Sequence, residues 1–266
     1  MLRDMTIGQY YPGKSLLHQL DPRVKLTGAL VFVVSAFLFE NWISFAIVTA
    51  FLGTCIILSR VPFRYMVKGL KPVVVILILT AVLNLLWTPG EILWQYRFLK
   101  ITKQGVMNSG YMLVRLIYLV LGTSLMTLTT TPTRLTDGME TGLSWMKLFK
   151  VPVHEIAMTM SIALRFIPLL LEETDKIMKA QMARGADFET GNIFRRAKSM
   201  VPLLVPLFVS AWRRAGDLAM AMEARCYHGG EGRTKMKPLK YRKKDFCSYG
   251  VLSVYLVGLI VIKVIL

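Results

Sequence analysis

Hydrophobic residues in this chain come in long, nearly uninterrupted blocks, separated by short polar segments and by one long basic stretch. The blocks cover residues 24–39, 43–58, 72–87, 111–131 and 247–266. A helix needs about 20 apolar residues to cross the hydrocarbon core of a bilayer. The first three blocks are slightly short, so we expect them to borrow flanking residues, unless one of them is a buried re-entrant segment. The pattern predicts an all-α membrane protein with about five transmembrane helices.

The positions of Lys and Arg predict how these helices are oriented. Basic residues precede the first block and fill the loop between the second and third, although the loop between the third and fourth argues mildly the other way. Residues 132–246 contain 20 Lys and Arg against 12 Asp and Glu, a net charge of +8. Because loops rich in Lys and Arg stay in the cytoplasm, we expect this stretch and the N-terminus inside, and the C-terminus outside.

Composition fits this class and narrows the alternatives. The 266 residues are 54% hydrophobic, with a formal net charge of +17 and a mean hydropathy of +0.50. The positive charge alternates with hydrophobic spans, so it indicates cytoplasmic loops rather than a nucleic-acid partner. Cys55, Cys226 and Cys247 show neither paired spacing nor zinc-ligand spacing to a His, so we expect no disulfide framework and no metal site. Arg3 and Asp4, followed by mostly polar residues, do not indicate a cleaved signal peptide.

Three helical segments are expected in the basic stretch, over residues 132–150, 152–184 and 192–227. Proline near the first turn opens the first two segments. Gly185 can end the second segment, and Asn192 can cap the third. The chain then divides into an N-terminal membrane domain, a cytoplasmic region and a C-terminal transmembrane helix, over residues 1–131, 132–246 and 247–266.

The second and third segments share one pattern, apolar on a broad face near one end and charged near the other. Internal prolines remove backbone donors and should bend both helices. These prolines are Pro168, Pro202 and Pro206. The apolar faces can contact a partner, and the alternative is that they pack on the membrane spans.

Both long segments also close on similar tripeptides, Ala183-Arg184-Gly185 and Ala224-Arg225-Cys226. An arginine fork can grip a carboxylate through two parallel hydrogen bonds. The ordinary alternative is that each arginine complements the negative end of its own helix dipole. Because two helices end on such similar tripeptides, we favour a paired docking function over the dipole alternative.

These features together resemble a known family, the transmembrane T component of energy-coupling factor (ECF) transporters. The two tripeptides match the family's paired arginine motifs, with Cys226 as a mild departure from the small residue expected there. Leu164-Arg165-Phe166-Ile167-Pro168 is similar to the family's second coupling helix. The opening segment also looks like that of the family, through Gly8-Gln9-Tyr10, Pro12-Gly13, Ser15, Leu17-His18 and Leu20-Asp21-Pro22-Arg23.

The resemblance implies a helical scaffold with cytoplasmic coupling helices, two of which cross. Their tips would insert into grooves on two ATP-binding-cassette ATPases, without fixing which arginine meets which ATPase. The apolar faces would hold a separate membrane subunit that binds a vitamin or other micronutrient. The residues expected on those faces are Met160, Leu164, Leu171, Leu204, Leu207 and Phe208. The resemblance implies that ATP is bound and hydrolysed by the partner ATPases, so we expect no ATP binding, no cofactor and no catalysis by the chain itself.

Two other classes of membrane protein are the alternatives. An integral membrane enzyme needs convergent catalytic groups, but His18, His154 and His228 are scattered along the sequence. A self-sufficient transporter or channel needs an ionisable pathway inside the membrane. Arg115 and Lys263 are expected near one interface instead.

Overall fold

The computed structural model describes residues 10–37, 42–96, 99–188, 192–230, 236 and 238–265. Gly8 and Gln9 of the opening segment lie outside the described residues. The chain forms two compact units. The bundle unit comprises the described residues of 10–141 and 239–265, and the long-helix unit comprises those of 142–238.

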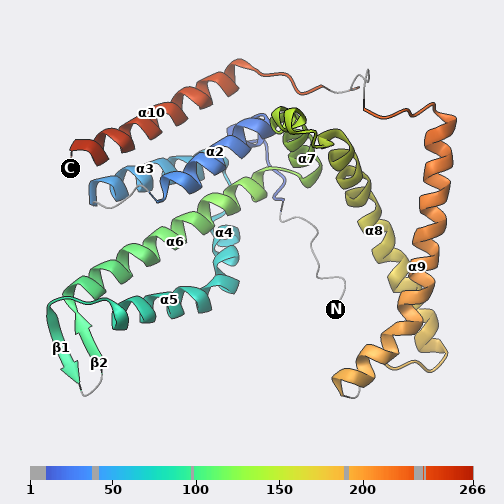
Figure 1. The fold of residues 1–266 in the computed structure, drawn as a ribbon, viewed down its shortest axis with the longest axis horizontal. Coiled ribbons are helices and arrows are strands. Elements are labelled where there is room, and N and C mark those ends of the chain that lie inside the picture. The colour runs from blue at the N-terminus through green and yellow to red at the C-terminus, as the bar shows by residue number, and fades with distance from the viewer. Residues whose placement is uncertain are drawn as a thin grey trace. The chain divides into compact units, whose positions relative to one another are not determined.

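The bundle unit is built from helices around a shared apolar core (Figure 1). Its central helix α6 packs against α2, α3, α4 and α5, while α10 packs against α2 and α3. The core is aliphatic and aromatic, with Phe51 and Tyr255 stacked at 4.2 Å between ring centroids. The helices are α1 (Leu16–Gln19), α2 (Pro22–Ser35), α3 (Trp42–Ser59), α4 (Phe63–Leu70), α5 (Val74–Trp87), α6 (Lys103–Thr129), α7 (Pro132–Gly142) and α10 (Lys243–Ile265).

The opening segment is explained by local structure. Ser15 caps α1 and lies 2.6 Å from His18 Nδ1, while His18 Nε2 lies 2.9 Å from the carbonyl oxygen of Tyr11. Gly13 lies against the same ring, where a Cβ would come within 2.9 Å of His18 Cε1. Asp21 caps α2, with Pro22 in the first turn, the position where proline costs no hydrogen bond.

The same segment is fastened to the start of α10. The buried Asp245 carboxylate accepts from Asp21 N at 2.9 Å and from Arg242 N at 2.7 Å. Arg23 donates to the Leu239 carbonyl oxygen at 3.0 Å and lies over the Tyr241 ring. Residues far apart in the sequence thereby close the bundle unit, so this part of the family signature has a structural role.

A short β-hairpin, which the sequence pattern did not predict, joins α5 to α6. Strands β1 (Ile92–Tyr96) and β2 (Leu99–Thr102) are antiparallel, with Ile92 opposite Thr102. Thr102 then caps α6 by accepting from Gly105 N at 3.0 Å. Because of this cap, α6 begins at Lys103 rather than at the expected residue 111.

The long-helix unit is dominated by α8 (Val153–Ala183) and α9 (Ile193–Ala224), which run antiparallel and cross (Figure 1). Arg214 and Ser210 both donate to the Glu173 carboxylate, Ser210 at 2.9 Å. The two long helices that were expected to cross do so, and their bounds lie close to those predicted. Pro168, Pro202 and Pro206 all lie inside these continuous helices.

The first segment of the basic stretch was predicted as one helix over residues 132–150, and this was wrong. Helix α7 ends at Gly142, and a separate 3₁₀-helix covers Ser144–Phe149. Glycine disfavours a continuing helix. The boundary between the two units also falls here, since α7 belongs largely to the bundle unit.

Five segments of the described chain are long and apolar enough to cross a membrane, and the all-α membrane class is confirmed. They are α3, residues 63–87 (α4 and α5 together), α6, α8 and α10. Helix α2 is absent from this set because its 14 residues span only about 21 Å, and it ends at Ser35, short of the predicted residue 39. The apolar first half of α8 qualifies instead.

Candidate functional site

Arg184 occupies the C-cap of α8, where the chain turns out of the helix. Gly185 follows at φ +89°, in the left-handed region that favours glycine. Gly185 N donates to the Met182 carbonyl oxygen, and Ala186 N donates to that of Gln181, both at 3.0 Å. This pair of hydrogen bonds is a Schellman motif, which satisfies two carbonyls at the helix end.

Arg225 ends α9 with the same hydrogen-bonding pattern. Cys226 N donates to the Glu223 carbonyl oxygen at 2.8 Å, and Tyr227 N donates to that of Met222 at 3.1 Å. Cys226 has φ +55°, a conformation that costs a residue with a side chain about 1–2 kcal/mol. Cys226, standing where glycine would fit best, therefore holds a strained backbone conformation.

The two arginines stand at opposite ends of the antiparallel pair. All six residues of the two tripeptides are exposed. A straight helix of the 32 residues of α9 would be about 48 Å long, which sets the scale of their separation. Each end is a C-terminus, so the favourable dipole interaction applies to both arginines, while their guanidinium groups stay accessible to a partner.

An apolar strip runs along α9 on the side away from α8. Leu204 is 57% exposed, Phe208 68% and Trp212 73%. These residues recur every four positions and so share one helix face, and the Phe208 and Trp212 rings stack at 6.3 Å. Sequence reasoning missed Trp212, although its spacing from Phe208 could have placed it on this face.

The other residues expected on the apolar faces differ in how exposed they are to solvent. Met160 on α8 is 42% exposed. Leu164, Leu171 and Leu207 are half-buried. Leu207 lies three residues before Ser210, which contacts α8, so it belongs to the face turned toward the partner helix.

A hollow of 560 Å³ lies between the first half of α8 and the end of α9. It brings together two arginines, Arg165 and Arg225, from segments far apart in sequence. The remaining lining residues are Met158, Ser161, Ile162, Phe166, Leu218, Met222, Cys226, Tyr227, His228 and Gly229. The sequence marked Arg165 only as part of the motif at residues 164–168. Its proximity to Arg225 could not be predicted, because it depends on the antiparallel register of the helices.

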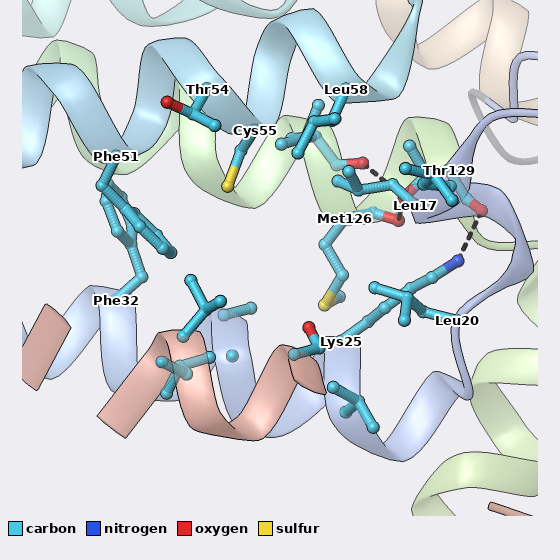
Figure 2. A pocket seen from close by; sticks show the side chains of 18 of the residues that line it. Leu17, Leu20, Lys25, Phe32, Phe51, Thr54, Cys55, Leu58, Met126 and Thr129 are labelled. Carbon is cyan, nitrogen blue, oxygen red and sulfur yellow. Dashed lines mark hydrogen bonds between the residues drawn. The ribbon is translucent and has the colours of Figure 1, made fainter. Parts of the chain in front are cut away.

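A second hollow, of 380 Å³, lies within the bundle unit among α2, α3, α6 and α10 (Figure 2). Its walls are almost entirely apolar, and Cys55 and Met126 point toward the space (Figure 2). Lys25 extends along it and donates to the Thr129 carbonyl oxygen at 2.9 Å. Because Thr129 is the last residue of α6, Lys25 caps that helix. The described residues that line this hollow include no set of catalytic groups.

Comparison with known proteins gives a consistent answer. The chain matches the profile of the CbiQ family, described as "Cobalt transport protein", over residues 13–236. The energy-coupling factor transporter transmembrane protein EcfT of Clostridium kluyveri is 51% identical over 248 residues, 92% of each chain. The EcfT protein of Thermosediminibacter oceani is 50% identical over 264 residues, 99% of this chain and 100% of the relative. That of Bacillus subtilis is 52% identical over 246 residues, 92% of this chain and 93% of the relative.

An all-helical protein with several membrane-spanning segments, whose relatives are membrane components of transporters, falls in the class of multi-pass transport subunits. The chain belongs to the family of energy-coupling factor transporter transmembrane proteins. The resemblance read from the sequence is confirmed. Its relatives are named as transporter transmembrane proteins, which does not favour the membrane-enzyme alternative.

Proposed function

We propose that this chain transmits force from two ATP-binding-cassette ATPases to a separate membrane subunit that binds a vitamin or other micronutrient. Arg184 would dock on one ATPase and Arg225 on the other. The observation that carries the proposal is the matched pair of helix ends. Each presents an exposed arginine at the C-cap of a Schellman motif, at opposite ends of two crossing helices.

The crossing supports a lever mechanism. Glu173 of α8 accepts hydrogen bonds from Ser210 and Arg214 of α9, so the helices are joined in the second half of each. If ATP-driven closure of the ATPases brings the two arginine ends together, the angle between α8 and α9 must change. The exposed strip of Leu204, Phe208 and Trp212 would then move, together with the substrate-binding subunit resting on it.

The same proposal implies where the chain lies and which tasks belong to its partner subunits. The chain would lie in the bacterial cell membrane, with its N-terminus and the arginine ends in the cytoplasm and its C-terminus outside. ATP hydrolysis would occur in the partner subunits, and this chain would need no cofactor. The transported compound would be selected by the substrate-binding subunit, which can be exchangeable because an apolar, methionine-containing surface repacks readily.

The test replaces both docking arginines in the assembled transporter. Arg184→Ala combined with Arg225→Ala should weaken ATPase binding at least about 30-fold and abolish ATP-driven uptake, because truncating one partner of a charge pair costs about 2–5 kcal/mol. Binding is measured on the complex in lipid nanodiscs, and uptake in proteoliposomes. Normal ATP-driven uptake by the double variant would reject the docking hypothesis.

Two controls separate docking from other effects. Arg213→Ala removes an exposed arginine of α9 that lines neither hollow, so binding should stay within about twofold of the parent. Vesicles holding this chain alone should show no uptake. Substrate accumulation in those vesicles would instead identify a self-sufficient transporter.

A further inference from the structure

The hollow between α8 and α9 places a second arginine, Arg165, beside the same space as Arg225. We propose that Arg165 and Arg225 form one two-arginine docking pocket, which takes an acidic segment of an ATPase carrying an apolar side chain next to its carboxylates. This rests on the proposed function. It adds a second guanidinium, from a different helix, to one of the two contacts.

The antiparallel register of the helices makes the pocket. Near the crossing, Glu173 contacts Ser210 and Arg214, and Gln181 lies opposite Pro202. Following the same register, residues near 165 on α8 come opposite the end of α9. The helices cross rather than lie parallel (Figure 1), so they diverge toward this end and leave the 560 Å³ space open.

The segment after α9 closes one side of that space. The Schellman turn at Cys226 sends the chain back toward α8, and Tyr227, His228 and Gly229 line the hollow. Gly230 lies against the His154 ring, where a Cβ would come within 2.5 Å of the ring carbon Cδ2. A side chain at position 230 would therefore require the His154 ring to move, and the hollow is walled by both helices and by the returning chain.

The chemistry of the walls indicates the occupant. Both arginines are exposed, and no Asp or Glu is among the described residues that line the hollow. Two cations facing one space repel each other until an anion enters, and arginine forks bind carboxylates in a bidentate manner. The floor between them is apolar and half-buried, formed by Met158, Ile162, Phe166, Leu218 and Met222. An acidic protein segment with one apolar side chain complements both parts.

The Arg184 end differs in its surroundings. Arg184 lines neither of the two hollows described above. The second half of α8 that leads to it is polar, with Glu172, Asp175, Lys176 and Lys179. The two contacts should therefore be unequal, and Arg165 should act together with Arg225 and not with Arg184.

A double-mutant cycle tests this directly. The dissociation constant of the ATPase pair is measured on the complex in nanodiscs for Arg165→Ala, Arg225→Ala, Arg184→Ala and the two double variants that contain Arg165→Ala. Arg165→Ala alone should weaken binding about tenfold. Combined with Arg225→Ala, its effect should depart from additivity by about threefold or more, whereas with Arg184→Ala the effects should multiply within about twofold.

Further variants exclude a folding defect. Arg165→Lys keeps the charge and Arg165→Gln keeps a polar hydrogen-bonding side chain without the charge, and both should remain impaired because neither presents a guanidinium fork. Thermal unfolding of each variant is compared with that of Arg213→Ala. Full rescue by lysine, or binding by Arg165→Ala that equals binding by Arg213→Ala, overturns the two-arginine pocket.

The same data distinguish this inference from the proposed function. If Arg225→Ala weakens ATPase binding while Arg165→Ala does not, only the two-arginine pocket is wrong. If Arg184→Ala and Arg225→Ala both leave binding unchanged, the docking function itself is wrong.

Discussion

At the scale of single residues, the two arginine tripeptides at the ends of α8 and α9 share one backbone requirement. The third position of each tripeptide must adopt a positive φ, which Gly185 accepts readily and Cys226 accepts at a cost. The sequence indicated Gly185 as a helix terminator because glycine is common there. It could not show that Cys226 occupies the same conformation, since cysteine seldom does.

This geometry predicts opposite effects for glycine changes at two sites. Gly185→Ala should lower stability by about 1 kcal/mol, because alanine is strained at φ +89°. Cys226→Gly should raise stability by a similar amount. Amide hydrogen exchange at the C-terminal turns of α8 and α9, measured in detergent, reports both changes.

Gly216 supplies the matched control for these variants. It lies inside α9, and nothing is within 4 Å of the position that its Cβ would take. Gly216→Ala should therefore stabilise the helix by about 0.5–1 kcal/mol. Equal effects of alanine at positions 185 and 216 would contradict the assigned helix-end geometry.

At the scale of elements, hydrophobic blocks predicted most helices because apolar runs and helix-ending residues are local signals. The same signals placed α8 and α9 to within a few residues. They missed the β-hairpin at Ile92–Thr102, which is too short to show a clear alternation, and the break after Gly142. The pairing of Arg165 with Arg225 also escaped prediction, because it depends on how two helices cross.

The division of α9 into two faces gives a prediction at this scale. Leu204→Glu and Phe208→Glu place a carboxylate on the exposed strip, so they should weaken co-purification of the substrate-binding subunit about tenfold or more, at unchanged thermal stability. Leu207→Glu lies on the half-buried face toward α8 and should instead lower stability by about 1–3 kcal/mol. Both quantities are measured on the complex in detergent.

Asp217→Ala is the control for the exposed strip, because it alters an exposed polar residue of the same helix. It should change neither co-purification nor stability. If the Leu204→Glu and Phe208→Glu variants retain the substrate-binding subunit as the parent does, this strip is not the contact surface.

At the scale of the whole molecule, the family was readable from the sequence because its motifs are spread along the chain, and the comparisons confirm it. The set of spanning segments was harder to predict. Hydropathy alone treats residues 24–39 as a span, yet α2 ends early, and the apolar half of α8 resembles a span although its later half is charged. Both cases depend on where a helix ends. The sequence indicates helix ends less clearly than it indicates blocks of apolar residues.

The account depends most on where the two arginines lie in the assembled transporter. A cryo-electron microscopy structure of this chain with both ATPases and a substrate-binding subunit would show this directly. We expect the guanidinium groups of Arg184 and Arg225 to lie about 3 Å from carboxylates of two different ATPase subunits. Arginine ends that face bulk solvent, or that contact only their own chain, would contradict the account.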